Sequence, residues 1–411
     1  MSELALLGGS PVVAEPLPQW PPHRELVAAA VQEVALSDHW GAVDGPRKLQ
    51  LESRFAAFQD AAHGLAVSNG TVSLEIALRA LGIGSGDEVI VPAYTFLATA
   101  TTVLTVNALP VFVDVIDTAC IDPAAVEAAI TPRTRAIIAV HLGGQSADLT
   151  ALTAIADRYG LALIEDAAQA HGAAWEGQGV GSRGAFGSFS FQASKNLTAG
   201  EGGFLTTNDA DLADLAWSFH NCGRSRTGKW YEHDVLGGNH RMTEFQAATV
   251  LTLLDKLPEQ VERREAAAAH LAAGLAEVGG LTPGARDPRA TTHAFHIYQM
   301  TYDPGAFGGL SRARFVEALT AEGVECSGGY GVELNRQPVF ARANFDRRAT
   351  SYDPDQANVR YAELDLPVTR RLCAEAVWFY QTMLLAPDSY LDRVLEAIAK
   401  VRAGAAVLAT A

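Results

Sequence analysis

Short apolar runs alternate with amphipathic stretches from about Phe55 to Asp209, and this alternation restricts the possible folds most strongly. An apolar run without polar alternation is typical of a strand covered on both faces, as in a parallel sheet. The amphipathic stretches 71–82 and 148–160 each end in glycine, which commonly ends a helix. Seven runs have strand character: Gly64–Ser68, Asp87–Pro92, Leu109–Val115, Arg135–Leu142, Leu161–Ala168, Phe186–Phe191 and Gly202–Asn208. This order predicts an α/β domain with a mainly parallel, seven-stranded sheet.

The pattern changes after Asp209, which indicates a second domain. The chain has 411 residues, more than one hydrophobic core usually organises. A glycine-rich, aromatic stretch at 222–241 is typical of a functional loop, and a long helical stretch at 242–278 should break or kink at Pro258. Short strand and helix signals follow from Leu281. We predict a large domain at 1–260, which includes the N-terminal segment, and a smaller α+β domain at 261–411.

Charge and composition exclude several classes of function. Lys and Arg number 31 against 47 Asp and Glu, and the net charge of −16 repels nucleic acid. There is no apolar run of about 18 residues and no basic N-terminal region before an apolar one, so we expect a cytoplasmic protein that does not bind or cross a membrane. The four cysteines are widely spaced, which predicts neither a metal site nor a disulfide scaffold.

Ligands of open α/β sheets bind where strands end and helices begin, so the strand ends are the candidate sites. The first strand ends at Asn69 and Gly70, and a helix is expected to start at Thr71. A helix N-terminus presents free backbone N–H groups, and glycine permits close approach, a combination that suits a phosphate. An ordinary capped strand–helix junction explains the same residues, and on this stretch alone it is the more common case.

A second candidate is the end of the strand at 161–168, where Glu165 and Asp166 follow an apolar run. A carboxylate buried there needs a cationic partner, and a protonated heterocyclic nitrogen is one possibility. A helix cap or an ion pair with arginine is equally compatible. His171, a few residues later, is more typical of a packing residue, although a position over a cofactor ring is also possible.

The third candidate is Lys195, in the polar, glycine-rich stretch after the strand at 186–191. Burial or a neighbouring cation can lower the pKa of a lysine until its neutral amine attacks an aldehyde. Most lysines are surface residues, so the position is informative only together with the other two. A phosphate site, an acid for a ring nitrogen and an amine for an aldehyde are together what pyridoxal 5′-phosphate (PLP) requires. A nicotinamide enzyme would instead carry G-x-G-x-x-G after the first strand, and this chain has SNGTVS.

Several motifs also occur in the order typical of one family: VSNGTVSLEIAL, GDEVIVPAYTFLATA, LPVFVDV, AVHLGG, IEDAAQAHGA, GSFSFQASKNLTAGEGGFLTTND and GGNHRMTEFQAA. In these motifs the chain resembles the PLP-dependent sugar aminotransferases of the DegT (StrS-like) family, which have the aspartate-aminotransferase-like fold type I. The resemblance is strong from about Gly64 to Ala248 and looser afterwards.

The resemblance implies roles for individual residues. Lys195 matches the Schiff-base lysine, Asp166 the partner of the pyridine nitrogen, Gln169 the residue near the ring hydroxyl, and Phe96 the aromatic ring that stacks on the cofactor. Lys195 and Asp166 are therefore the expected catalytic pair.

The resemblance also implies a phosphate cradle and a dimer. Gly70, Thr71 and Ser190 match the cradle, and Asn239 matches an asparagine that reaches the phosphate of the neighbouring subunit. Family members are homodimers with shared active sites, so the same is expected here.

The implied reaction is transfer of an amino group from glutamate or glutamine to a keto-sugar or keto-cyclitol, in amino-sugar or aminoglycoside-like biosynthesis. Gly143 departs from the tyrosine that many members acting on nucleotide sugars carry in HLYG, which favours the branch that acts on cyclitols. Two alternatives remain: a PLP-dependent dehydratase or aromatising lyase, and a non-catalytic regulator. The retained lysine argues against the dehydratases, in which histidine replaces it, and intact cofactor positions argue against the regulator.

Overall fold

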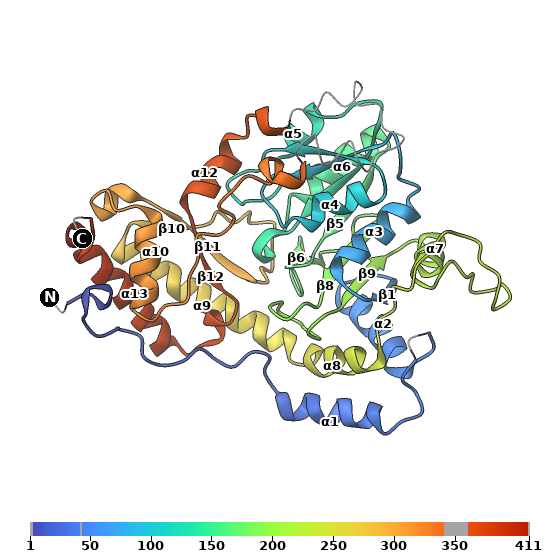
Figure 1. Ribbon diagram of the computed structural model, residues 1–411, viewed down its shortest axis with the longest axis horizontal. Coiled ribbons are helices and arrows are strands. Elements are labelled where there is room, and N and C mark those ends of the chain that lie inside the picture. Colours follow the sequence, from blue (N-terminus) through green and yellow to red (C-terminus); the bar gives the residue numbers. More distant parts are fainter. Residues whose placement is uncertain (1–2, 42, 341–360, 410–411) are drawn as a thin grey trace.

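The computed structural model describes residues 3–41, 43–340 and 361–409. A large sheet with helices on both faces forms one part, and a smaller sheet with its own helices forms the other; the long helix α9 runs between them (Figure 1). The strands are β1 His63–Val67, β2 Glu88–Pro92, β3 Leu109–Val113, β4 Thr134–Val140, β5 Ala162–Asp166, β6 Ala174–Trp175, β7 Gln178–Gly179, β8 Phe186–Ser190, β9 Gly203–Thr207, β10 Leu281–Pro283, β11 Ile297–Tyr302 and β12 Ala376–Tyr380. The α-helices are α1 Arg24–Ala35, α2 Pro46–Phe58, α3 Gly70–Ala80, α4 Ala98–Thr105, α5 Pro123–Ala128, α6 Leu149–Tyr159, α7 Ala210–His220, α8 Glu244–Leu254, α9 Leu257–Val278, α10 Arg312–Ala321, α12 Pro367–Glu375, α13 Asp388–Ala403 and α14 Ala405–Leu408.

The large sheet has seven strands in the order β1-β9-β8-β5-β4-β2-β3. The five strands from β8 to β3 run parallel, and β9 runs antiparallel to both β1 and β8. Each strand lies within or close to a predicted run, so the mainly parallel seven-stranded sheet is confirmed. The carboxyl ends of β5 and β8 are neighbours, and they bring Asp166 and Ser190 to the same edge of the sheet.

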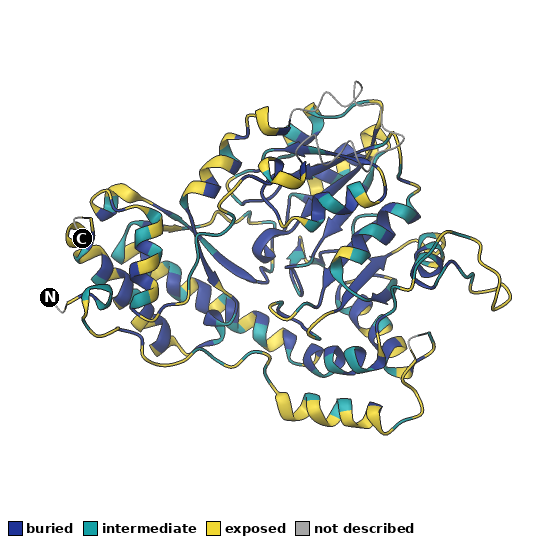
Figure 2. Ribbon diagram, in the orientation of Figure 1, coloured by how far each residue is buried: buried dark blue, intermediate teal, exposed yellow. Residues whose placement is uncertain are grey.

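Both faces of this sheet are buried, which explains the unbroken apolar runs. In β2, Ile90 packs into one hydrophobic cluster, while Val89 and Val91 pack into another on the opposite face. The strands of the large sheet are dark blue in Figure 2, whereas α1 is mostly exposed. Successive side chains of a strand point to opposite faces, so a fully covered sheet needs apolar residues at both parities.

The predicted helix limits have local causes. The side chain of Asp148 accepts a hydrogen bond from the backbone N–H of Ala151 at 3.0 Å and caps the start of α6. Gly160, with φ 65°, takes the left-handed conformation that ends this helix. The predicted break in the long helical stretch is also confirmed: α8 ends at Leu254, and Pro258 lies in the first turn of α9, where its missing N–H costs nothing.

The small part contains the antiparallel sheet β10-β11-β12 and a separate hydrophobic cluster that includes α10 and α13. Leu4, Val12 and Val13 from the N-terminal segment pack into this cluster, although we predicted that segment with the large domain. The packing of these residues differs from the expectation. The N-terminal segment has no helical or strand pattern, so its sequence does not indicate which domain it packs against. The boundary at residue 260 itself stays a prediction.

Two further features bear on function. The segment 222–241 contains no helix or strand and projects beyond α7 (Figure 1), as a loop does. In the described part of the chain, no helix is both long and apolar enough to span a membrane.

Candidate active site

The N-terminus of α3 lies against the end of β8. The side chain of Asn69 caps the helix by accepting a hydrogen bond from the backbone N–H of Val72 at 2.9 Å. A Cβ atom added to Gly70 would lie 2.8 Å from the Cβ of Ser190, which is too close for two carbon atoms that are not bonded to each other. Thr71 is exposed beside them. The free N–H groups of the first turn and the hydroxyls of Thr71 and Ser190 can therefore surround a phosphate.

Gly70→Ala is expected to weaken PLP binding, because its methyl group would displace Ser190 from the cradle. Overpacking of this kind costs about 1–3 kcal/mol, so the Kd for PLP should rise roughly ten- to a hundredfold. Fluorescence titration of the cofactor-free protein measures it. Gly84→Ala is the control, since a Cβ atom there has only an ordinary contact, 3.7 Å from the carbonyl oxygen of Val106. An unchanged Kd in Gly70→Ala would contradict the cradle.

Glu165 and Asp166 are adjacent in β5 but serve different parts of the molecule, because consecutive side chains point to opposite faces. Glu165 is fully buried and accepts hydrogen bonds from His141 Nε2 at 3.0 Å and from the backbone N–H of Gly181 at 2.6 Å. Burial opposes its ionisation, yet these hydrogen bonds lower its pKa. Glu165 thus anchors the loop after β7 and orients His141, which makes it a structural carboxylate.

Asp166 is the last residue of β5 and lies at the same edge of the sheet as Ser190. It is buried, and burial raises the pKa of its carboxyl group. The opposing influences are a 2.8 Å hydrogen bond from the hydroxyl of Thr99 in α4, a weaker one from the backbone N–H of Ala168, and the charge of Lys195. A desolvated carboxylate held in this way is suited to a cationic ligand group, because a cation would stabilise its charged form.

Thr99→Val is expected to shift the acidic limb of the pH–activity profile to higher pH. If the ionised form of Asp166 is the active one, activity falls as the pH drops through the pKa of its carboxyl group. Because Thr99 donates to the charged form, its loss raises that pKa. Thr102→Val is the control: Thr102 is also a buried α4 threonine, but its hydroxyl hydrogen bonds to the backbone of its own helix. A limb that stayed in place, or moved to lower pH, would contradict this role of Thr99.

Lys195 lies close enough to Asp166 for their charges to interact. Burial lowers the pKa of Lys195 to about 8, and the charge of Asp166 acts in the opposite direction. A considerable fraction of the amine is therefore neutral near physiological pH, as a nucleophile or base requires. The segment is held from two sides: the indole Nε1 of Trp20 donates to the carbonyl of Ala193 at 2.8 Å, and the Nδ2 of Asn196 donates to the carbonyl of Ala294 at 2.7 Å.

Buried nitrogen-rich side chains surround this lysine, and the motifs did not reveal all of them. His171 packs among Phe55, Phe189 and Phe191, and burial, together with the charge of Lys195, lowers its pKa to about 3. The neutral ring of His171 and its aromatic neighbours favour a packing role for this residue. His296, directly before β11, contacts Asn196 at 3.1 Å, and its pKa is also lowered by burial and by Lys195.

Gln169 connects the site to both parts of the molecule. Its Oε1 accepts a hydrogen bond of 2.7 Å from the backbone N–H of Gly143. Tyr330 of the small part lies beside Gln169 and Asp166, and burial raises its pKa, so its hydroxyl stays neutral. Nothing in the sequence around Tyr330 marked it, because its only signal is spatial proximity to residues more than 150 positions away. The predicted role of Gln169 near the ring hydroxyl stays a prediction.

Phe96 and Asn239 lie at the surface of the single chain. The side chain of Phe96 is 60% exposed near the end of the β2–α4 connection, three residues before Thr99. Asn239 is exposed and its backbone pairs with Asn221. Their predicted roles, stacking on the ring and reaching a neighbouring subunit, stay predictions.

The comparisons with known proteins agree with this geometry. Residues 22–398 match the model of the DegT/DnrJ/EryC1/StrS aminotransferase family. The chain is 43% identical, over 98% of both proteins, to a putative L-glutamine:3-amino-2,3-dideoxy-scyllo-inosose aminotransferase of Streptoalloteichus tenebrarius. It is 40% identical, over 97% of both, to the L-glutamine:2-deoxy-scyllo-inosose aminotransferase of the same organism.

Solved structures of similar fold were also found. The crystal structure of 3-amino-5-hydroxybenzoic acid synthase superimposes with a TM-score of 0.85 at 34% identity, covering 95% of this chain and 99% of that one. The predicted fold and family are therefore both confirmed. The chain belongs to the DegT/DnrJ/EryC1/StrS aminotransferase family and is an aminotransferase.

Proposed function

We propose that this protein is a PLP-dependent aminotransferase that moves an amino group from L-glutamine to the ketone of an inosose-type cyclitol, and that it works as a homodimer. The observation that carries the cofactor assignment is the placement of Lys195, with its pKa lowered to about 8, within electrostatic reach of the buried carboxylate of Asp166. The α3 N-terminus and Ser190 supply the anion site at the same edge of the sheet.

The described residues suit three groups of PLP: its phosphate, its aldehyde and its ring nitrogen. When bound, PLP supplies an aldehyde for amine exchange and a ring that accepts the electron pair released at the α-carbon of the donor. Lys195 would hold the aldehyde through its amine. Once released, the same Nζ would accept the proton lost from the α-carbon of the donor, and in the second half-reaction it would deliver a proton to the carbon of the acceptor that gains the amine. Asp166 would hold a proton on the ring nitrogen through its negative charge, which the hydrogen bonds from Thr99 and from the N–H of Ala168 stabilise.

The donor and the acceptor come from the relatives. Both aminotransferases from Streptoalloteichus tenebrarius are named for L-glutamine and for a scyllo-inosose, and each matches this chain over almost its full length. Gly143 agrees with a cyclitol acceptor, since it stands where a tyrosine occurs in many members that act on nucleotide sugars. With φ 65°, Gly143 also has a backbone conformation that disfavours a tyrosine.

A donor and acceptor panel tests this function. The purified enzyme with PLP should aminate 2-deoxy-scyllo-inosose or its 3-amino derivative with L-glutamine, and chromatography of the derivatised amine detects the product. L-Glutamate in place of L-glutamine, and a nucleotide-linked keto-sugar in place of the cyclitol, serve as comparisons. Turnover only with the nucleotide-linked sugar would contradict the proposed acceptor, and turnover only with glutamate would contradict the donor.

The synthase neighbour motivates one further comparison, because its product is an aromatic ring. An aromatising enzyme would raise the ultraviolet absorbance of a suitable cyclic substrate without consuming an amino donor. We expect amine transfer here, since the two inosose aminotransferases have the higher identities, 43% and 40% against 34%.

Mixing two defective variants tests the shared site. If Asn239 serves the neighbouring subunit, Lys195→Ala and Asn239→Ala each lower the activity, and their mixture regains up to about a quarter of it, because half of randomly mixed dimers carry one intact site. The regain is measured after exchange of subunits in dilute denaturant. The control is Asn239→Ala carried through the same exchange procedure alone. A mixture no more active than the two variants measured separately would contradict a shared site.

A further inference from the structure

The segment that carries Lys195 lies outside the regular secondary structure. Residues 191–202 connect β8 to β9 and contain no helix or strand. Within the segment, the backbone N–H of Lys195 donates to the carbonyl of Gln192 at 2.9 Å. A local bond of this kind does not fix a side chain in space, because a loop without a hydrogen-bond ladder changes its backbone angles easily. The position of the amine therefore depends on the contacts that the segment makes with other parts of the molecule.

Asn196, the residue after this lysine, makes two contacts with a turn that is 98 and 100 positions away along the chain. Its Nδ2 donates to the carbonyl of Ala294 at 2.7 Å, and its Oδ1 lies 3.1 Å from the Nδ1 of His296. A carbonyl oxygen can only accept, so Asn196 must present Nδ2 to Ala294 and its oxygen to His296. Burial lowers the pKa of His296, and its neutral ring therefore carries the proton on Nδ1, which donates to Asn196. Asn196 is 2% exposed, and both bonds lie away from competing water.

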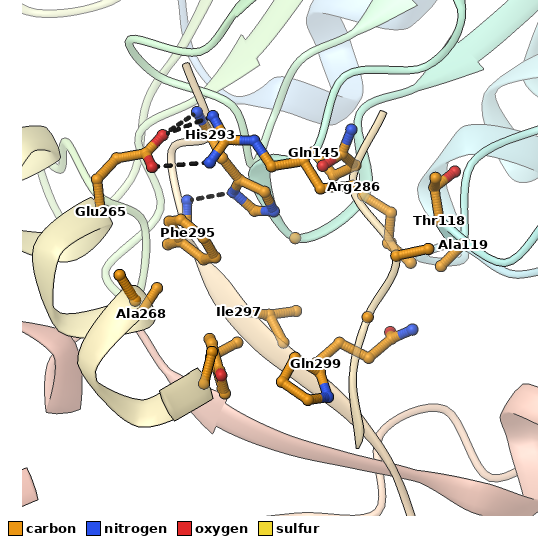
Figure 3. Close-up of a pocket in the computed structure, with 18 residues that line it drawn as sticks. Thr118, Ala119, Gln145, Glu265, Ala268, Arg286, His293, Phe295, Ile297 and Gln299 are labelled. Carbon is orange, nitrogen blue, oxygen red and sulfur yellow. Dashed lines mark hydrogen bonds and ion pairs between the residues drawn. The ribbon is translucent and has the colours of Figure 1, made fainter. Parts of the chain in front are cut away.

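The turn has an unusual backbone at the residue between these two partners. Phe295 has φ 45°, in the left-handed region that a bulky side chain seldom adopts. Such a conformation costs free energy and persists only where surrounding contacts hold it. Figure 3 shows the ring of Phe295 against that of His293; the ring centroids are 3.7 Å apart, and the N–H of Phe295 donates to the Nδ1 of His293 at 2.8 Å. The carbonyl of Ala294 and the Nδ1 of His296 both reach Asn196, and we call this pair the 294/296 fork.

Two other parts of the molecule hold the turn in place. Glu265 of α9 accepts a hydrogen bond from the backbone N–H of His293 at 2.7 Å (Figure 3). The carbonyl of Gly144, in the turn after β4, accepts from the N–H of Ala294 at 3.1 Å. A Cβ atom added to Gly144 would lie 2.8 Å from the backbone nitrogen of Phe295, so these two turns are in close contact. The 294/296 fork therefore has a defined position relative to α9 and to the end of β4.

We propose that Asn196 is a positioning residue for the reaction: by binding the 294/296 fork, it keeps the amine of Lys195 within reach of the cofactor aldehyde. This inference rests on the proposed PLP function. Trp20 restrains the chain on the other side of the lysine, since its Nε1 donates to the carbonyl of Ala193 at 2.8 Å. With a restraint before and after it, Lys195 loses less conformational freedom when it bonds to the cofactor. Asn196 is uncharged and acts only through its neighbour.

Comparison of PLP with pyridoxamine 5′-phosphate measures the position of the amine. The two molecules share the ring and the phosphate, but the second has an amine in place of the aldehyde and forms no covalent bond with a lysine. A displaced Lys195 therefore weakens the binding of PLP alone, whereas damage to the ring or phosphate site weakens the binding of both. Fluorescence titration of the cofactor-free, full-length enzyme gives the two Kd values without turnover, and their ratio is the readout.

Asn196→Ala removes both contacts with the fork. We expect the affinity for PLP, relative to that for pyridoxamine 5′-phosphate, to fall about tenfold, because two neutral hydrogen bonds no longer hold the segment. Asn208→Ala is the matched control. Asn208 follows β9, and its amide also joins two backbone segments: Nδ2 donates to the carbonyl of Ser182 at 2.7 Å, and Oδ1 accepts from the N–H of Ala62 at 2.8 Å. The ratio in this control should stay within about twofold of the wild-type ratio.

Two substitutions of His296 test the fork even if Asn196→Ala disturbs folding. His296→Leu leaves the Oδ1 of Asn196 without its donor and should lower the ratio about three- to tenfold. His296→Asn should restore the ratio to within about twofold of the wild type, because the amide nitrogen of asparagine can take the place of Nδ1.

Several results would overturn the proposal. An unchanged ratio in Asn196→Ala would do so, and an equal loss of affinity for both molecules would show that Asn196 only supports the fold. A wild-type ratio in His296→Leu, or a ratio in His296→Asn as low as in His296→Leu, would contradict the role of the fork. A wild-type enzyme that formed no covalent bond with PLP would instead contradict the proposed function, so the two failures can be told apart.

Discussion

Lys195→Ala is expected to lower kcat by at least about 10⁴-fold, because the variant loses both the amine that binds the aldehyde and the base that carries the α-proton. Among the described residues, Lys195 is the lysine whose charge acts on Asp166, and its pKa is lowered to about 8. The protein should also lose the visible absorbance of lysine-bound PLP. Steady-state amination of the cyclitol ketone and an absorbance spectrum measure the two effects.

Lys256→Ala is the control for this variant, since Lys256 lies at the junction of α8 and α9 and takes no part in the site. It should keep its activity and its spectrum. If Lys195→Ala turned over within tenfold of the wild type, the assigned role of Lys195 would be wrong.

Asp166→Asn is expected to lower kcat by roughly 10²–10³-fold while PLP stays bound. The amide has the shape of the carboxylate and can still accept from Thr99, so the hydrogen bond remains and the charge is lost. Without that charge the ring nitrogen loses its proton, and a neutral ring accepts the electron pair from the α-carbon poorly. Single-turnover rates with L-glutamine isolate the chemical step.

Asp157→Asn, on the exposed face of α6, controls for the change of one charge in the protein. It should leave the single-turnover rate unchanged. A rate in Asp166→Asn equal to that of the wild type would show that Asp166 is not the partner of the ring nitrogen.

The fold could be predicted in some detail because its determinants are local. Apolar runs identify strands when both faces of the sheet are buried, and Asp148 and Gly160 mark the limits of α6 by their capping chemistry. The strand ends then indicate the edge at which Asp166 and Ser190 lie, because parallel strands end on the same side.

The different roles of Glu165 and Asp166 could not be predicted from their adjacent positions in the sequence. From the sequence alone, either carboxylate could face the site. The answer depends on which face of the strand each side chain points to and on the residues that pack against that face. In the structure, Glu165 meets His141 and three backbone N–H groups on one side, while Asp166 meets Thr99 on the other. Thr99 lies within one of the motifs that carry the resemblance. The sequence did not show that its side chain points from α4 toward Asp166.

Contacts between distant segments were the least predictable. The packing of Leu4 and Val12 with the small domain, and the position of Tyr330 beside Gln169, both depend on tertiary contacts rather than on local pattern. The buried Arg264 of α9 is similar: its guanidinium hydrogen bonds to the Oε1 of Gln381 at 2.5 Å, and burial lowers its pKa to about 9. Helical periodicity identifies which residues of α9 face inward, but it does not show that an arginine among them packs near His296.

Borohydride reduction followed by peptide mapping tests the central claim most directly. The enzyme is purified with PLP, reduced, digested and examined by mass spectrometry. Covalent attachment of the cofactor to the amine of Lys195 predicts a phosphopyridoxyl group on the peptide that contains Lys195, in a yield close to one per chain. An unmodified Lys195 peptide, or the group on another lysine, would contradict the account.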